Sequence, residues 1–565
     1  MLSSLDIALA VRPKPIENIA RALGILPEEL ELHGRFIAKV DLAMLSRLAG
    51  KAPGKLVLVT AITPTPLGEG KTTTTLGLVD GLNYVGVRAA ATVRQPSLGP
   101  VFGIKGGANG GGYAQVVPMV EFNLHLTGDA HAVGAANNLA AAFLDNHLHH
   151  GNALKIDPLS VTWPRVLDIS DRALREVVVG LGGKEGGIPR QEEFFITAAS
   201  EVMAILAMAG GLEDLRARLG RVVLARRTDG SPVTADDLKV AGSMAVLLRE
   251  AIKPNLMQTL EGNPVLVHAG PFGNIAQGTS SVLADRLALQ LCEVVCTEAG
   301  FGADLGGEKF FDIKCRHSGL VPDAAVMVAT IRALKMHGGV GRIVSGKPLD
   351  AALTREDVEA VRRGASNLAK QIENVRAFGI PVVVAINSFP TDTPAEVAAV
   401  REVAKAAGAR EAVTSTHFAE GGRGAEALAR AVRSMLEADE GRFQPLYPDE
   451  WPLARKIEAV ATRMYGADGV DVLIKAARQL ADFEKLGYGR LPVCIAKTHL
   501  SLSHEPELKG RPSGFRLPIR EARLSAGAGF VTAVAGEMRL MPGLPSHPSG
   551  ETMDVEGAGK VVGLH

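Results

Sequence analysis

The chain has 565 residues, too many for a single hydrophobic core, which predicts about two to four domains. Its 61 basic and 61 acidic side chains balance, so the composition argues against a dedicated nucleic-acid or membrane-surface binder. No apolar run approaches the roughly 18–20 residues that cross a bilayer, and the N-terminus shows no signal-peptide pattern, since Asp6 and Arg12 interrupt its short apolar stretch.

Apolar runs alternate with amphipathic segments along the whole chain. We expect strands at 56–62, 87–93, 264–268, 293–297, 381–386 and 491–496, and helices at 15–23, 72–82, 133–149, 195–209, 281–290, 323–335, 394–407, 424–436 and 468–486. This alternation is typical of an α/β protein with a doubly wound, mostly parallel sheet and additional smaller α/β domains. The expected domains are 1–365, with 150–235 as a candidate insertion, then 366–445 and 446–565.

A glycine-rich turn follows the first strong strand. The segment Thr63–Thr75, TPTPLGEGKTTTT, lies between strand 56–62 and helix 72–82. A strand, a glycine turn, Gly-Lys-Thr and a helix are typical of a phosphate-binding loop (P-loop), in which backbone N–H groups and the helix N-terminus face an anion. We therefore expect a P-loop core in which Lys71 reaches the outer phosphates of ATP and the Thr72 hydroxyl holds Mg²⁺.

The whole turn is predicted to contact the nucleotide. The expected residues are Thr65, Pro66, Leu67, Gly68, Glu69, Gly70, Lys71, Thr72 and Thr73. Thr65 stands where this motif usually begins with glycine, and the prolines on either side of it stiffen that arm of the turn. The alternative is an ordinary strand-to-helix turn with a solvated lysine.

Two polar segments come next. Residues 94–113 hold seven glycines between 99 and 112, together with Arg94 and Lys105, which predicts bare N–H groups and positive charge around an anion. A flexible exposed loop is the alternative. Residues 123–152 carry many Asn, Asp and His side chains and predict a polar substrate wall, with a transition-metal site as the weaker interpretation. Asp129 in this segment is a candidate to help position Mg²⁺, directly or through water.

Further polar segments follow other predicted strands. Residues 271–281, 298–316 and 387–393 each place Gly, Asn or Asp after a strand, where open α/β sheets bind ligands. Phe389 is predicted to be a platform for a flat ring, and the alternative is a loop aromatic in a local cluster. The four cysteines, at 292, 296, 315 and 494, form no Cys-x-x-Cys pair and predict buried thiols in a reducing, cytoplasmic compartment. A metal site made by the first three is the weaker alternative.

These blocks resemble the formate–tetrahydrofolate ligase family over nearly the whole chain. The resemblance is carried by TPTPLGEGKTTTT, QPSLGPVFGIKGGANGGGYAQVVPM, NLHLTGDAHA, ANNLAAAFLDNH, EAGFGADLGGEKFFDIKCR, AINSFPTDT, GYGRLPVCIAKT, SAGAGF and MPGLP. It implies a homotetrameric ligase of one-carbon metabolism that uses ATP, Mg²⁺, formate and tetrahydrofolate, with K⁺ or NH₄⁺ as activator. Formate would attack the γ-phosphate to give formyl phosphate, and N10 of tetrahydrofolate would then take the formyl group.

The resemblance also implies roles for single residues. Arg94 would hold the transferred phosphate, Phe389 and Phe418 would sandwich the pterin ring, and Phe301 would form a wall of the same region. Three positions depart from the family pattern: Gln95, Phe418 and Leu500 stand where the family usually has Glu, Trp and Tyr.

These departures leave two alternatives. One is a P-loop ligase that uses ATP on another small acid. The other is a non-catalytic nucleotide-binding protein, against which the retained Lys71, Thr72 and Arg94 argue.

Overall fold

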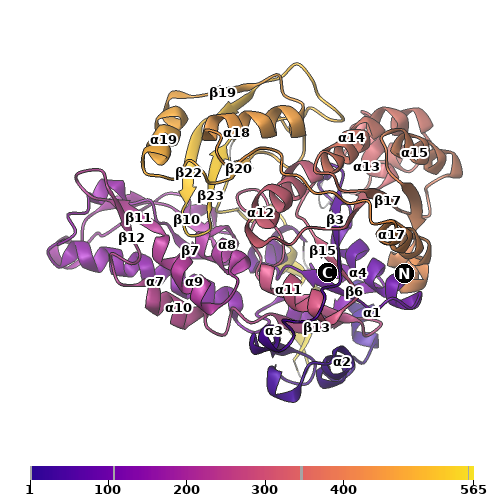
Figure 1. Ribbon diagram of the computed structural model, residues 1–565, viewed down its shortest axis with the longest axis horizontal. Helices are drawn as coiled ribbons and strands as arrows, with labels where there is room; N and C mark the ends of the chain where they lie inside the picture. The colour runs from indigo at the N-terminus through magenta and orange to yellow at the C-terminus, as the bar shows by residue number, and fades with distance from the viewer. Residues whose placement is uncertain (1–2, 106–107, 344–347, 537, 558, 565) are drawn as a thin grey trace.

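A central α/β body carries two lobes in the computed structural model, which describes residues 3–105, 108–343, 348–536, 538–557 and 559–564 (Figure 1). The insertion lobe (residues 129–248) forms the magenta part on the left, and the C-terminal lobe (residues 446–535) forms the orange-to-yellow part above it. Within the described ranges, no helix is long and apolar enough to cross a membrane.

The body is built on a 12-stranded mixed sheet with the order β1-β2-β13-β14-β4-β15-β3-β16-β17-β18, to which β6 and β5 attach through β13. All neighbours from β14 to β18 are parallel, whereas the β1, β2 and β13 end is antiparallel. The strands are β1 (Leu30–Leu32), β2 (Ala38–Val40), β3 (Lys55–Ala61), β4 (Ala89–Val93), β5 (Gly110–Gly111), β6 (Ala114–Val117), β13 (Asn255–Thr259), β14 (Pro264–Val267), β15 (Val294–Glu298), β16 (Ala324–Ala329), β17 (Val382–Asn387) and β18 (Glu411–Ser415).

Helices cover both faces of this sheet, as the doubly wound prediction requires. Along β3, Val57 and Val59 pack into one core with α4 (Lys71–Tyr84) and α17 (Glu426–Ala438). Leu56 and Leu58 point the other way, into a core that includes α11 (Val282–Leu291), α13 (Ile331–His337), α14 (Val358–Arg376) and α15 (Pro394–Ala406). Burial on both faces explains why these parallel strands are continuous apolar runs in the sequence. Near the N-terminus lie α1 (Ser4–Ala10), α2 (Ile16–Leu23) and α3 (Ala43–Arg47).

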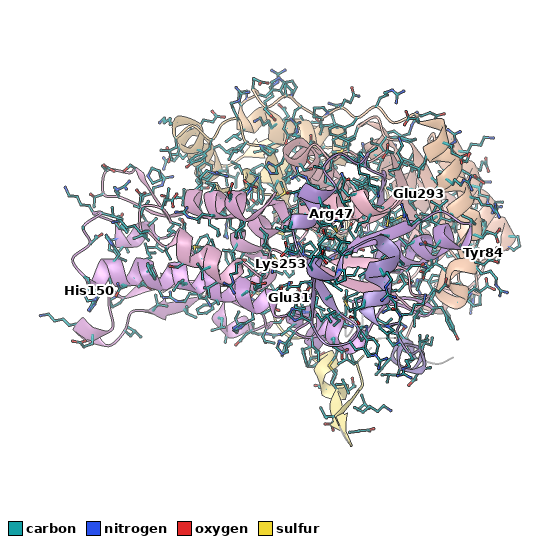
Figure 2. The ribbon with its side chains drawn as sticks, turned by 60° about the horizontal axis from the view of Figure 1, so that its bottom comes forward. Glu31, Arg47, Tyr84, His150, Lys253 and Glu293 are labelled. Carbon is teal, nitrogen blue, oxygen red and sulfur yellow. The ribbon has the colours of Figure 1, made fainter. Side chains whose placement is uncertain are left out.

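The insertion lobe contains the predicted insertion 150–235, and it supplies most of a separate hydrophobic cluster that also includes Leu283 of the body and Phe530 of the C-terminal lobe. Its helices are α7 (Asp129–His149), α8 (Glu201–Met208), α9 (Leu212–Arg221) and α10 (Ala241–Leu248). Its strand pairs are β7 (Arg165–Leu167) with β10 (Phe194–Ile196), β8 (Val177–Val179) with β9 (Arg190–Glu192), and β11 (Val223–Arg226) with β12 (Pro232–Thr234). In Figure 2, His150 marks the outer end of α7, far from the body.

The C-terminal lobe packs against the body through a buried ion pair. Lys497 Nζ lies 2.9 Å from Asp304 Oδ2, and both side chains are almost fully buried. The lobe contains α18 (Leu453–Val460), α19 (Ile474–Lys485), β19 (Val470–Val472), β20 (Val493–Ala496), β21 (Leu517–Ile519), β22 (Glu521–Ser525) and β23 (Phe530–Val534). Beyond it, the hairpin of β24 (Asp554–Glu556) and β25 (Lys560–Val562) lies in the yellow C-terminal segment that projects from the body (Figure 2).

The six predicted strands are confirmed as β3, β4, β14, β15, β17 and β20. Three predicted helices were wrong at their starts: 195–209, 323–335 and 468–486 begin as strands β10, β16 and β19, and only then become helical. A short apolar run has no period that separates a buried strand from a buried helix, which explains the error. The expected boundary at 365/366 lies inside α14, and β17 and β18 continue the central sheet; the three-domain division itself stays a prediction.

Candidate functional site

The predicted phosphate-binding turn lies between β3 and α4, at the carboxyl edge of the parallel sheet. Gly68 and Gly70 both have φ of 75°, a conformation that favours glycine. A Cβ on Gly70 would also lie 3.0 Å from Asn387 Nδ2, so a close neighbour adds to the need for glycine. The turn therefore leads directly into the first residues of α4, whose backbone N–H groups have no helical partners.

Glu69 holds the turn together from inside. Its carboxylate accepts hydrogen bonds from the Thr65 backbone N at 2.9 Å and from the Thr330 hydroxyl at 2.5 Å. Burial raises the pKa of Glu69 above its ordinary value. The sequence predicted a nucleotide contact for Glu69, but the side chain is turned inward and closes the arm that begins at Thr65. This internal bond gives the turn its shape where the usual first glycine is replaced.

Asn387 joins the turn to the loop that carries Phe389. Its Nδ2 donates to the Glu69 carbonyl at 2.9 Å, and its Oδ1 accepts from the Thr74 hydroxyl at 3.0 Å. Asn387 is the last residue of β17 and is buried. Asn387 therefore links the turn by hydrogen bonds to the start of the Phe389 loop, since Phe389 follows only two residues later.

A carboxylate connects Thr72 and Arg94. Glu298 ends β15, the strand between β3 and β4, and it accepts a hydrogen bond from the Thr72 hydroxyl at 2.7 Å. Its other oxygen lies 3.9 Å from Arg94 Nε. A Cβ on Gly300 would lie 3.3 Å from the Arg94 guanidinium, so the glycine makes room for that side chain.

Sequence analysis missed Glu298, although its position at the end of a predicted strand was a usable signal. A hydroxyl and a carboxylate together supply the oxygen ligands that Mg²⁺ prefers. Thr72 and Glu298 are therefore the pair of oxygen ligands that could hold a cation next to the Arg94 guanidinium.

Two of the predicted aromatic residues follow neighbouring strands. Phe389 comes after β17 and Phe418 after β18, and the Ser388 N donates to the Ser415 carbonyl at 3.1 Å between the two loops. The Arg332 guanidinium carbon lies 4.0 Å from the centre of the Phe389 ring. Phe418 keeps 51% of its surface exposed.

The glycine run packs against the segment of Phe418. The Tyr113 N donates to the Phe418 carbonyl at 2.9 Å, and a Cβ on Gly112 would lie 2.1 Å from that same oxygen. Glycine at 112 is therefore needed for this close approach. The Lys105 side chain, predicted to face an anion, lies outside the described part of the chain.

Phe301 forms a different contact. It follows β15 with φ of 59°, and its ring stacks on His499 with the centroids 4.5 Å apart. His499 comes from the loop after β20, so the C-terminal lobe supplies one ring of this stacked pair. Sequence analysis did not single out His499, because nothing in the linear order places it beside Phe301.

The family model of formate–tetrahydrofolate ligase matches residues 2–565. The chain belongs to this family. A formate–tetrahydrofolate ligase of Roseiflexus sp. is 61% identical over 564 residues, covering all of both chains. Those of Saccharopolyspora erythraea and Rubrobacter xylanophilus (ligase 3) are 58% and 57% identical, and each alignment covers the whole of this chain and at least 99% of the relative.

Gln95 and Leu500, two of the positions that depart from the family pattern, each follow a residue described above, Arg94 and His499. Gln95, which stands where the ligase family usually has Glu, is buried, and its Nε2 has no hydrogen-bond partner among the described residues. Its backbone N donates to the Ala269 carbonyl at 2.7 Å. Leu500 belongs to the loop of His499, where its carbonyl accepts from Lys509 Nζ at 3.0 Å. None of the three departures lies in the turn before α4: Gln95 follows Arg94, and Phe418 and Leu500 lie in two other segments.

Among the described residues, Asp129 and Thr72 share no hydrogen bond. Its carboxylate pairs with Lys39 Nζ at 2.8 Å and accepts from Asn255 Nδ2 at 2.8 Å. Its role at Mg²⁺ stays a prediction, whereas Glu298 contacts Thr72 directly. In the described ranges, no group of three or more His, Cys, Asp or Glu side chains is arranged to hold a metal ion, and the four cysteines are buried and free.

Proposed function

We propose that this chain joins formate to tetrahydrofolate with ATP, giving 10-formyltetrahydrofolate, ADP and phosphate. A formate oxygen attacks the γ-phosphorus, the bond to the ADP oxygen breaks, and formyl phosphate forms. N10 of tetrahydrofolate then attacks the formyl carbon, the carbon–oxygen bond to phosphate breaks, and the N10 proton leaves to solvent. Formate offers only its charge for recognition, so the protein must supply positioning and charge neutralisation.

The observation that carries this proposal is the contact of Glu298, at the end of β15, with Thr72 at the start of α4 and with Arg94 after β4, in a member of this family. Lys71 and the N-terminal amides of α4 bind the phosphates of ATP in a P-loop core. The Thr72 hydroxyl, with Glu298 beside it, fits Mg²⁺, which supplies charge neutralisation on the phosphates. Arg94 holds the phosphoryl group as it is transferred.

On the folate side, Phe389 and Phe418 sandwich the pterin ring, and Phe301 with His499 forms a further wall. The family resemblance extends the proposal to activation by K⁺ or NH₄⁺ and to a homotetramer. The cation and the tetramer rest on the resemblance alone. The folate side is also supported by Phe389 and Phe418, which follow neighbouring strands, and by the stacking of Phe301 on His499.

The test is an absorbance assay of folate formylation with formate, MgATP and K⁺. We expect formylation and ADP release that both require formate and tetrahydrofolate. Acetate and glycine serve as matched acids, because the departures at Gln95, Phe418 and Leu500 leave another small acid as the competing substrate. Equal or faster ADP release with one of these acids would overturn formate as the substrate. ATP binding without any turnover would instead favour the non-catalytic alternative.

A further inference from the structure

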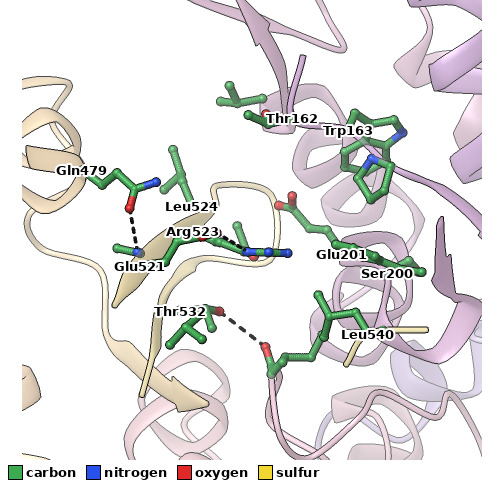
Figure 3. Close-up of a pocket in the computed structure, with 18 of the residues that line it drawn as sticks. Thr162, Trp163, Ser200, Glu201, Gln479, Glu521, Arg523, Leu524, Thr532 and Leu540 are labelled. Atoms are coloured by element: carbon green, nitrogen blue, oxygen red, sulfur yellow. Dashed lines mark hydrogen bonds and ion pairs between the residues drawn. The ribbon is translucent and has the colours of Figure 1, made fainter. Parts of the chain in front are cut away.

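A cavity of about 530 Å³ lies between the insertion lobe and the C-terminal lobe (Figure 3). Its walls come from segments around β7, β10 and α8 on one side and from α19, β22 and β23 on the other. Its volume falls in the range of about 300–1,000 Å³ that is typical of small-molecule sites. None of the residues assigned above to ATP, formate or the pterin ring lines it.

Aromatic and aliphatic side chains make up much of the wall. Trp163 and Phe195 come from the insertion lobe, and Phe483 and Phe530 come from the C-terminal lobe. The indole of Trp163 is held in place because its Nε1 donates to the Asn137 carbonyl at 3.0 Å. Aromatic side chains in the wall favour a ligand with an apolar body, and such rings also stabilise an organic cation. The Arg523 guanidinium already lies over the Phe195 ring, 5.5 Å from its centre, which leaves the other three rings for the ligand.

The cations that line the cavity are already paired with carboxylates. Arg523 lies 2.7 Å from Glu521 and 3.5 Å from Glu193. Arg226 lies 3.7 Å from Asp482. An anionic ligand would therefore have to displace an internal carboxylate, which argues against the acidic tail of a folate as the occupant.

Glu201, at the start of α8, is the carboxylate without such a partner. It accepts hydrogen bonds from the backbone N of Gly527 at 2.7 Å and of Ala528 at 3.2 Å. Within the described part of the chain it makes no ion pair, and burial raises its pKa to about 7. Arg218 donates to the carbonyls of the same two residues, so the turn that holds Glu201 is fixed from both sides. Figure 3 shows Glu201 and Arg523 reaching into the cavity from opposite walls.

We propose that this cavity is a second ligand site, and that it binds an organic monocation with an apolar or aromatic body through Glu201. An amidinium, guanidinium or ammonium group would supply the charge that Glu201 lacks, and the aromatic walls would cover the rest of the ligand. This site is independent of the proposed ligase reaction.

The test uses benzamidine and its neutral isostere benzamide with the full chain in calorimetric titrations. We expect benzamidine to bind at least tenfold more tightly than benzamide, as a charge-assisted hydrogen bond in a buried site predicts. Glu201→Gln keeps an acceptor for Gly527 and Ala528, so the fold should hold. It should weaken benzamidine at least tenfold while leaving benzamide binding within about threefold.

Two further variants separate this site from other sites. Glu185→Gln removes an exposed carboxylate from the same lobe and should leave benzamidine affinity unchanged. Leu524→Trp, which fills the cavity from the β22 side, should abolish binding of both probes while Glu201 is kept. Formylation by Glu201→Gln should equal that of the parent, which also reports folding. Equal affinity for the two probes, no benzamidine binding up to 10 mM (roughly the −3 kcal/mol level), or unchanged benzamidine binding in Glu201→Gln would each overturn the proposal.

Discussion

Replacing Asn387 with Ala should disturb the ATP and folate sides of the site together. The change removes two buried hydrogen bonds, one to the Glu69 carbonyl and one from the Thr74 hydroxyl. Thr74 keeps an alternative acceptor, because its hydroxyl also lies 2.9 Å from the Gly70 carbonyl. The Glu69 carbonyl loses its side-chain partner, and leaving such a buried group unsatisfied costs about 1–3 kcal/mol. That range corresponds to about 5- to 150-fold in an equilibrium constant.

The assay is steady-state kinetics with each substrate varied in turn, together with tetrahydrofolate titrations with and without a non-hydrolysable ATP analogue. We expect kcat/KM to fall at least about fivefold for both substrates, as the lower end of that range predicts. We also expect the effect of the nucleotide on folate affinity to shrink toward unity. Ser388→Ala is the matched control, since it alters the next side chain and keeps both bonds. An Asn387→Ala enzyme with a raised folate KM but an unchanged ATP KM would show that Asn387 shapes the folate loop alone.

Five further variants test other parts of the structure. Lys71→Ala should lower kcat about 10²-fold or more. Normal turnover in the folded Lys71 variant would refute the assignment of Lys71 to the phosphates. Glu298→Gln should raise the Mg²⁺ concentration needed for half-maximal rate. Phe389→Ala should raise the folate KM about tenfold with little change in the ATP KM. If Phe389→Ala instead loses only ATP affinity, the Phe389 ring lies at the adenine. Phe418→Trp should bind folate equally or more tightly. Burial lowers the pKa of His337 to about 4, so its stabilisation is complete above the ordinary pKa of 6.5 and is lost as the pH falls toward 4. His337→Gln should therefore show a smaller drop in melting temperature between pH 7 and pH 5, and an equal drop would contradict this.

Five strands of the parallel part of the sheet, β3, β4, β14, β15 and β17, could be predicted from the sequence because they are largely buried on both faces, whereas β16 was wrongly predicted as helix and β18 was not predicted. Runs such as Lys55–Ala61 and Val382–Asn387 are mainly apolar and short, and turn residues bound them. The antiparallel strand β13, NLMQT, escaped prediction because its polar residues hide the apolar pattern. Its Asn255 and Gln258 are buried and hydrogen-bonded to side or main chains far away in the sequence, which no local pattern reveals.

The candidate site also contains residues that the sequence predicts and residues that it does not. The turn around Gly70 and Lys71 has a local signature, since spacing alone predicts a strand, a glycine turn and a helix. His499 has no such signature, and Glu298 has only its place at the end of a predicted strand. Neither position identifies its partner, because Thr72 and Phe301 each lie more than 190 residues away. Such contacts depend on strand order, and strand order is fixed by tertiary packing rather than by local propensity.

The most direct test of the account is the fate of oxygen from labelled formate. Formate carrying ¹⁸O in both positions is incubated with MgATP, tetrahydrofolate, K⁺ and the enzyme, and the products are analysed by mass spectrometry. If a formate oxygen attacks the γ-phosphorus, the phosphate released carries one ¹⁸O and the formyl group keeps the other. Unlabelled phosphate from a reaction that forms 10-formyltetrahydrofolate would contradict the formyl phosphate route and the roles given to Lys71 and Arg94.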